Sequence, residues 1–270
     1  VYLQLLARGY PYEILGLIET NIHLLGLADP ESGDSFHLLG TDRLGRDQWS
    51  RLMYGSRTSL SIGLVAVIIS TILGIILGGI SGYYGGTVDL VIQRLIELLQ
   101  SLPAVPIWLA LSAAMPRSWS VEQTYFAITI ILALIAWTTL AREIRSRFLT
   151  LREEDYVVAA KLSGAKEARV VFRHMMPTMY SHIIASVTLA IPVMIISETF
   201  LSFLGLGVQA PEASWGSLAN EGAAAINALS INWWLILFPG LFLSATLLAL
   251  NFLGDGLRHA FDPTGRSRGS

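Results

Sequence analysis

Residues 142–177 read REIRSRFLTLREEDYVVAAKLSGAKEARVVFRHMMP and form a charged island between two long apolar stretches. The island carries eight of the chain's 18 lysine and arginine residues. Small residues within it (Ala159, Ala160, Gly164) follow a helical spacing, and this pattern ends at Pro177. A loop that concentrates positive charge stays on the cytoplasmic side of a membrane. The stretch therefore predicts a cytoplasmic loop with a defined shape, which suits a docking surface better than a solvated linker.

The composition indicates a membrane protein. Hydrophobic residues make up 53% of the 270 residues, the mean hydropathy is +0.57 and only 14% are charged, against about 25% in a soluble domain. Five windows with little or no charge approach or exceed the roughly 20 residues that a helix needs to cross a bilayer: 58–88, 98–116, 123–141, 175–197 and 222–255. We predict an all-α polytopic membrane protein with five transmembrane helices.

The distribution of positive charge predicts the orientation of these helices. Twelve lysine and arginine residues fall in the central loop, at Arg94 and in the C-terminal region. The short loops 116–122 and 205–221 contain only Arg117 between them. Because lysine and arginine resist translocation, the central loop and the C-terminus are expected in the cytoplasm.

This orientation sets the expected domain organisation. An extracytoplasmic segment (1–57) precedes a transmembrane domain (58–257), which contains a cytoplasmic loop (149–177) and is followed by a cytoplasmic tail (258–270). The first segment has neither a span nor a signal peptide that would export it. We therefore expect a sixth transmembrane helix ahead of Val1.

Four glycines in the first window are spaced four residues apart and would lie on one face of a helix: Gly74, Gly78, Gly82 and Gly86. Such a stripe lets another backbone approach closely, so it predicts a helix-packing face. Glycine is also common in membrane helices without such a role. The end of the stripe (GYYGG, 82–86) alternatively ends the helix at the cytoplasmic surface, with its tyrosines at the interface.

The central loop itself is expected to form two short helices. The first opens with acidic residues at 153–155, which complement a helix N-terminus, and ends at Gly164 with a left-handed cap. The second is expected over 166–176, with Pro177 marking the entry to the next span. The alternative is an amphipathic hairpin that rests on lipid headgroups.

The stretch AAKLSGAKEARVVFRHMMP (159–177) resembles the cytoplasmic "EAA" loop of ABC importer permeases, with its glycine followed thirteen residues later by a proline. Further segments are similar to permeases of the peptide-type importers, the dipeptide, oligopeptide and nickel group. These are LGTDRLGRDQWSRLMYGSRTSL (39–60), GYYGGTVDLVIQRLIE (82–97), SFLGLGVQAPEASWGSL (202–218) and NFLGDGLRHAFDP (251–263). The loop departs from the family pattern at three positions. Val158 stands where glutamate is often found, Ser163 precedes the glycine, and Met176 replaces the usual leucine.

The resemblance implies the fold of a type I ABC importer permease in a prokaryotic inner membrane. It also implies four kinds of partner: a second homologous permease, two cytoplasmic ABC ATPase subunits, an extracytoplasmic substrate-binding protein and the lipid bilayer. The chain has no G-x-x-x-x-G-K-[ST] phosphate loop, so ATP and magnesium are expected on the ATPase subunits, and the chain is expected to bind no cofactor, metal or nucleic acid. The residues implied in ATPase coupling are Ala159, Ala160, Leu162, Ser163, Gly164 and Ala165.

Glu198 is a carboxylate deep in an apolar stretch. An acid at mid-membrane costs roughly 2.5–3.5 kcal/mol, so it should face protein or a water-filled path. One interpretation is a position on the translocation path. The other is a hydrogen bond to a neighbouring helix near the outer surface.

Other function classes remain as alternatives. Residues 79–82 (GISG) match the motif around the serine of rhomboid-type intramembrane proteases, for which His182 is the one histidine in or beside a span that could act as base. A secondary transporter would need intramembrane ion-coupling groups, of which Glu198 is the candidate. Within the importer class the substrate stays open between peptides, oligosaccharides, opines and nickel. The absence of cysteine excludes disulfides and thiolate chemistry.

Overall fold

The computed structural model describes residues 3–14, 18–27, 37–116, 118–208, 210–226 and 232–261. Arg117, Arg266 and Arg268, which contribute to the orientation argument, lie outside the described residues. The chain divides into two units, Val1–Ser50 and Arg51–Ser270. Each unit is described by itself.

The first unit contains an antiparallel hairpin of β1 (Leu3–Ile14) and β2 (Ile18–Leu27), which hydropathy alone did not predict. A tight loop follows the hairpin. In this loop the Asp42 carboxylate accepts hydrogen bonds from the backbone N–H groups of Leu44 (2.8 Å) and Arg46 (2.9 Å). Asp47 then accepts a hydrogen bond from the backbone of Ser50 (2.7 Å), so it satisfies a free N–H group at the start of the first long helix.

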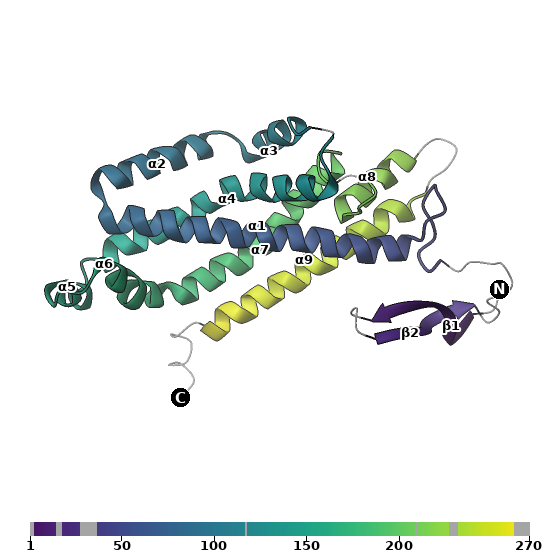
Figure 1. The fold of residues 1–270 in the computed structure, drawn as a ribbon, viewed down its shortest axis with the longest axis horizontal. Helices are drawn as coiled ribbons and strands as arrows, with labels where there is room; N and C mark the ends of the chain where they lie inside the picture. Colours follow the sequence, from purple (N-terminus) through teal and green to yellow (C-terminus); the bar gives the residue numbers. More distant parts are fainter. Residues whose placement is uncertain are drawn as a thin grey trace. The chain divides into compact units, whose positions relative to one another are not determined.

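The second unit is a bundle of long helices (Figure 1). The long helices are α1 (Gln48–Tyr84), α4 (Val121–Leu151), α7 (Tyr180–Phe203) and α9 (Trp234–Phe261). The shorter ones are α2 (Gly86–Ser101), α3 (Ala104–Ala113), α5 (Asp155–Leu162), α6 (Glu167–Arg169) and α8 (Trp215–Ala225). Apolar side chains of α1, α4 and α7, such as Ile62, Leu132 and Leu201, form a buried core between them.

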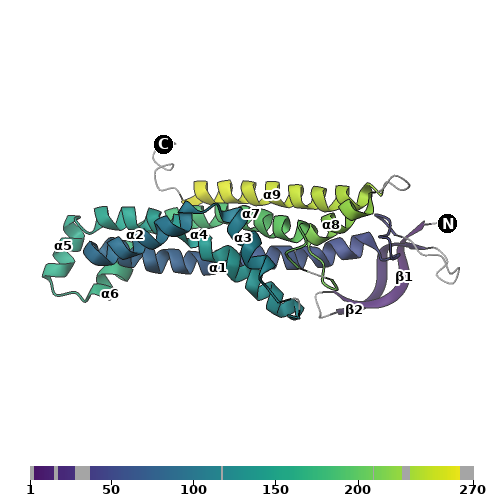
Figure 2. The same cartoon turned by 90° about the horizontal axis from the view of Figure 1, so that it is seen from above.

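Four helices among the described residues are long and apolar enough to cross a membrane, and a fifth crossing results if a bent pair counts as one span. The bent pair is α2 and α3, which meet at 82° (Figure 2). The span expected over 98–116 therefore has the wrong bounds, because the two helices of this pair run over Gly86–Ser101 and Ala104–Ala113. Pro103 explains the break, because a proline disfavours the helical region for the residue before it, and Leu102 is extended (φ −97°, ψ 136°).

Two further boundaries differ from those expected from the sequence. The last apolar window (222–255) is divided between α8 and α9. Pro177 does not separate the loop from the next span, because helix continues from Glu167 to Phe203. Around the proline the helix changes form, to a π-helical segment at Val170–Met175 and a 3₁₀ turn at Met176–Met179. Proline lacks the N–H group that an i to i−4 hydrogen bond needs, so Pro177 leaves one bond of the ladder unmade.

The short helix α8 is held against three long helices by glycine. A Cβ on Gly55 of α1 would lie 3.3 Å from the Ser214 backbone, and one on Gly222 would lie 2.7 Å from the Leu235 backbone of α9. A Cβ on Gly216 would lie closer still to the Thr199 backbone of α7. Arg51 and Glu221 add a two-point ion pair between α1 and α8, at 2.5 and 2.8 Å. This end of the bundle is therefore joined by direct backbone contacts.

Candidate functional site

The central loop ends its first helix with a glycine cap. Gly164 has φ +81°, which confirms the predicted left-handed cap. The N–H of Ala165 donates to the carbonyl of Ala160 (3.1 Å) and the N–H of Gly164 donates to that of Lys161 (3.0 Å). This is the Schellman arrangement. It satisfies two carbonyls at the helix end and turns the chain sharply toward α6.

The inner side of the loop is part of the protein core. Val157 and Val170 are fully buried and pack against Ile144 and Phe148 of α4. Burial of a valine side chain contributes about 1.5–3 kcal/mol. The loop is therefore fixed to the ends of α4 and α7, which does not fit a hairpin that merely rests on lipid headgroups.

The outer side of the loop is exposed. Leu162, at the end of α5, is 84% exposed. The residues implied in coupling divide between the two sides. Ala159, Ser163 and Gly164 are exposed with Leu162, whereas Ala160 and Ala165 are half-buried against the core.

Two tyrosines at the end of α1 contact this loop, which the sequence analysis did not foresee. The Tyr84 hydroxyl donates to the Glu167 carboxylate at 2.8 Å. The Lys161 ammonium lies 5.1 Å from the centroid of the Tyr83 ring, within the range of a cation–π interaction. The loop is thus supported by α1 as well as by the helices that it connects.

The glycine stripe of α1 lies against α4 over three of its four members. A Cβ on Gly74 would meet Leu140 at 3.0 Å, and one on Gly78 or Gly82 would meet α4 backbone atoms or Phe148 at 2.5–3.1 Å. Gly86 is not part of this face. It lies beyond the end of α1, as the first residue of α2, with φ +57° and nothing within 4 Å of a Cβ.

An ion pair below the stripe joins α2 to α4. Arg145 donates to both carboxylate oxygens of Asp89, through Nε to Oδ1 and through a terminal nitrogen to Oδ2 at 2.5 Å. Ser81 of α1 also donates to Asp89 (2.5 Å), and Gln93 donates to the Ser81 hydroxyl (3.3 Å). No spacing rule links residues 56 apart in sequence, so this network could not be found from the sequence.

Glu198 lies in the protein interior with 0% exposure. The Ser202 hydroxyl, one turn further along α7, donates to one carboxylate oxygen at 2.7 Å. Hydroxyl groups of Ser59 on α1 and Ser214 ahead of α8 also lie beside the carboxyl. In this chain Glu198 is enclosed by packed protein.

The protease alternative requires a hydrogen bond between Ser81 and a histidine base. In the structure Ser81 is bonded to Asp89 and Gln93, and His182 is bonded to Glu143 and Arg147. A serine–histidine pair is therefore not formed here. Arg94 and Glu97, in the second half of α2, form a local ion pair at 2.6 Å.

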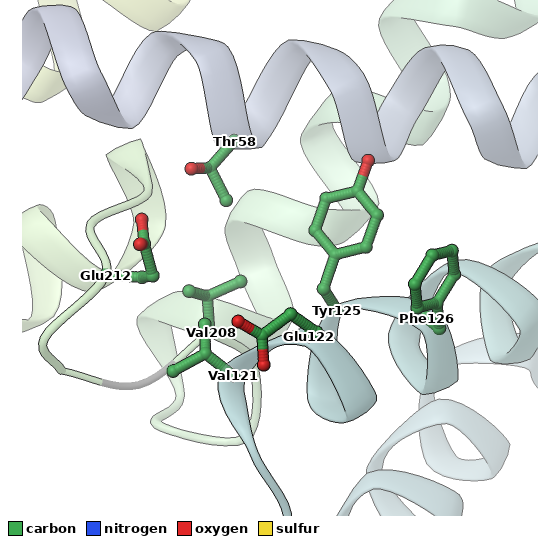
Figure 3. Close-up of a pocket in the computed structure, with 7 residues that line it drawn as sticks. All are labelled: Thr58, Val121, Glu122, Tyr125, Phe126, Val208 and Glu212. Carbon is green, nitrogen blue, oxygen red and sulfur yellow. The ribbon is translucent and has the colours of Figure 1, made fainter.

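A small pocket of about 200 Å³ lies near the start of α4, at the end of that helix remote from the loop. Figure 3 shows the side chains that line it: Thr58, Val121, Glu122, Tyr125, Phe126, Val208 and Glu212. Two of them are carboxylates, and both are exposed.

A multi-pass bundle with a structured loop between two of its spans is the architecture of a type I permease of ABC importers. Residues 70–267 match the family described as "Binding-protein-dependent transport system inner membrane component". The chain belongs to this family and is a multi-pass protein of the inner membrane. It is 42% identical to the dipeptide transport system permease protein DppC of Bacillus subtilis over 87% of this chain and 70% of that protein.

Two other comparisons agree with this assignment. The oligopeptide transport system permease protein OppC of Bacillus subtilis is 38% identical over 89% of this chain and 75% of that protein. Among solved structures, a chain of the inward-facing MetNI methionine ABC transporter superposes with a TM-score of 0.59 at 16% identity, over 79% of this chain and 97% of that chain. At this identity the structural likeness shows the fold alone.

Proposed function

We propose that this chain is one of two paired permease subunits of an ATP-driven importer that carries peptides. A substrate-binding protein delivers the peptide from the extracytoplasmic side, and two ATPase subunits bind ATP and magnesium on the cytoplasmic side. The loop over 149–177 couples the two events. This chain catalyses no reaction itself.

Two lines of support favour this function over its alternatives. Relatives at 37–42% identity are named as permeases of dipeptide and oligopeptide transport systems, which favours peptides over oligosaccharides, opines or nickel. The loop also has the character of a docking element, since one side is anchored in the core and the other is exposed.

The observation that carries the proposal is the exposure of Leu162. Leu162 is 84% exposed beside the glycine cap, and burial of such an apolar side chain against another protein would contribute about 1.5–3 kcal/mol. A groove on a cytoplasmic ATPase subunit is the occupant that the family membership favours.

Substitution of Leu162 by glutamate tests this coupling role. Because the side chain is exposed, Leu162→Glu should leave insertion and folding unchanged but reduce recovery of the ATPase subunits and abolish transport. Leu44→Glu is the matched control, since Leu44 is 77% exposed in the loop ahead of α1. Equal ATPase recovery and equal transport in the two variants would contradict a docking role for the loop.

A second pair of variants tests the cap. Gly164→Asp and Gly86→Asp each place a side chain at a positive φ with open space around it, so both add a strain of about 1 kcal/mol. We expect Gly164→Asp to assemble with its permease partner yet transport nothing, while Gly86→Asp retains transport. Loss of transport in both variants would point to strain instead of a lost docking contact.

The substrate is tested with the reconstituted complex. Its ATPase rate should rise when the substrate-binding protein is loaded with a peptide and should not rise with an oligosaccharide. Stimulation by the oligosaccharide alone would keep the importer assignment and show that the substrate is an oligosaccharide.

A further inference from the structure

A mixed polar cluster joins α4 and α7 close to where the two helices enter the central loop. Glu143 and Arg147 are one turn apart on α4, and His182 and Ser186 are one turn apart on α7. His182 Nε2 and the Ser186 hydroxyl lie 3.1 and 3.0 Å from the same Glu143 oxygen, Oε2. The Arg147 guanidinium lies 3.3 Å from His182 Nδ1.

These contacts assign the donors and acceptors of the cluster. A guanidinium can only donate hydrogen bonds, so Nδ1 of His182 accepts. The proton of the neutral imidazole is then on Nε2, which donates to Glu143. The His182 imidazole therefore accepts a hydrogen bond from Arg147 and donates one to Glu143.

A comparison with Asp89 shows what is unusual about Glu143. Asp89 uses both carboxylate oxygens within the protein, and its side chain is only 16% exposed. Glu143 uses one oxygen, and its side chain is 39% exposed. Oε1 has no hydrogen-bond partner among the residues that the structure describes. Because the Glu143 side chain is 39% exposed, this oxygen is open to a ligand or to solvent.

The cluster lies on two helices that are long and apolar enough to cross a membrane. Ionisable side chains in such helices mark substrate and ion pathways. Arg147 likewise keeps donors beyond the one directed at His182, because a guanidinium carries five N–H groups. The cluster thus presents an available acceptor and available donors about one helical turn apart, roughly 5–6 Å.

We infer that Glu143 and Arg147 form a contact site for the charged ends of a peptide as it leaves toward the cytoplasm. The free Glu143 oxygen accepts hydrogen bonds from the peptide's α-ammonium group, and Arg147 donates to its carboxylate. An extended chain spans about 3.3–3.6 Å per residue, so groups this close together can contact both ends of a dipeptide, whatever its side chains are. The inference rests on the proposed function and deepens it.

Photo-crosslinking tests the site without the substrate-binding protein. The probe is the dipeptide alanyl-benzoylphenylalanine with free ends, added to the nucleotide-free complex in lipid nanodiscs, with the crosslinked residues mapped by mass spectrometry. We expect labels on α4 near residues 143–147 and on α7 near residues 182–186. Glutamine keeps the oxygen that His182 and Ser186 need, so Glu143→Gln should fold normally. It should lower labelling roughly tenfold, as loss of a charge-assisted hydrogen bond does.

Matched controls make the result specific. Glu97→Gln removes another exposed carboxylate from an arginine pair on a single helix and should leave labelling unchanged. The N-acetylated probe should label weakly, with little further loss in Glu143→Gln. Labelling elsewhere in the wild type, no labelling, or equal labelling of wild type and Glu143→Gln would each overturn the site. Failure of the intact transporter to import dialanine or trialanine would instead refute the proposed function.

Discussion

Replacement of Gly78 by alanine is the sharpest test of the contact between α1 and α4. The new Cβ would lie 2.5 Å from the carbonyl oxygen of Ala141 and 2.8 Å from its Cα. Ordinary contact begins near 3.4 Å, so the two helices would have to separate by about 0.9 Å, the difference between 3.4 and 2.5. Because the atoms met are backbone, no rotamer change can relieve the contact.

The expected cost follows from this geometry. Overpacking of a well-packed interface costs about 1–3 kcal/mol, and each kcal/mol lowers the Tm of a domain of this size by roughly 2–4 °C. Gly78→Ala should therefore unfold several degrees below wild type, and Gly78→Leu should fail to assemble.

The neighbouring residue supplies the control. A Cβ on Gly79 would meet only the Phe148 ring, at 3.7 and 3.8 Å, which is ordinary contact. Gly79→Ala therefore makes the same chemical change in the same helix and should be neutral. Thermal unfolding of the purified complex, followed together with its yield, measures both variants. Equal Tm values for Gly78→Ala and Gly79→Ala would refute the reasoning.

Three further predictions concern other parts of the chain. Asp89→Asn leaves Arg145 without its carboxylate and should destabilise the protein by roughly 1.5–3 kcal/mol in thermal unfolding; an unchanged Tm would show that the pair is dispensable. Since the sequence has no cysteine, an impermeant maleimide should label Glu212→Cys from outside and Lys166→Cys only after permeabilisation, and the reverse pattern would overturn the orientation. Burial acts to raise the pKa of Asp42, but hydrogen bonds from Arg46 and Leu44 and the charge of Arg46 outweigh it and hold the pKa below its ordinary value of 3.8. The stabilisation is therefore present above that value and is lost as pH falls through the lower folded-state pKa, so hydrogen exchange at Leu44 should rise at acid pH in wild type, whereas Asp42→Asn should show no such transition.

Features that depend on neighbours in sequence could be predicted. Hydropathy located the membrane-crossing region, and the small residues with Gly164 located the turn of the central loop. The glycine spacing indicated a packing face at Gly74, Gly78 and Gly82. Each of these signals is a local pattern whose physical cause lies within a few turns of helix.

Features that depend on long-range contacts could not be predicted. The bend between α2 and α3 lies within one continuous apolar window, so hydropathy passes over it and only Pro103 hints at it. The helix forms on either side of Pro177 are not given by hydropathy, which marks only an apolar stretch there. The partners of Asp89 and Glu143 come from other helices, and the sequence offers no rule that pairs them.

The glycines around α8 give this short helix a mechanical property that its size would not suggest. Side-chain contacts can absorb a small displacement by changing rotamer, but backbone-to-backbone contacts cannot. A shift of α1, α7 or α9 at this end must therefore move α8 by nearly the same amount. The short helix α8 therefore couples the displacements of α1, α7 and α9 at this end. A single added methyl group at Gly216 or Gly222 would force α8 and its neighbouring helix apart.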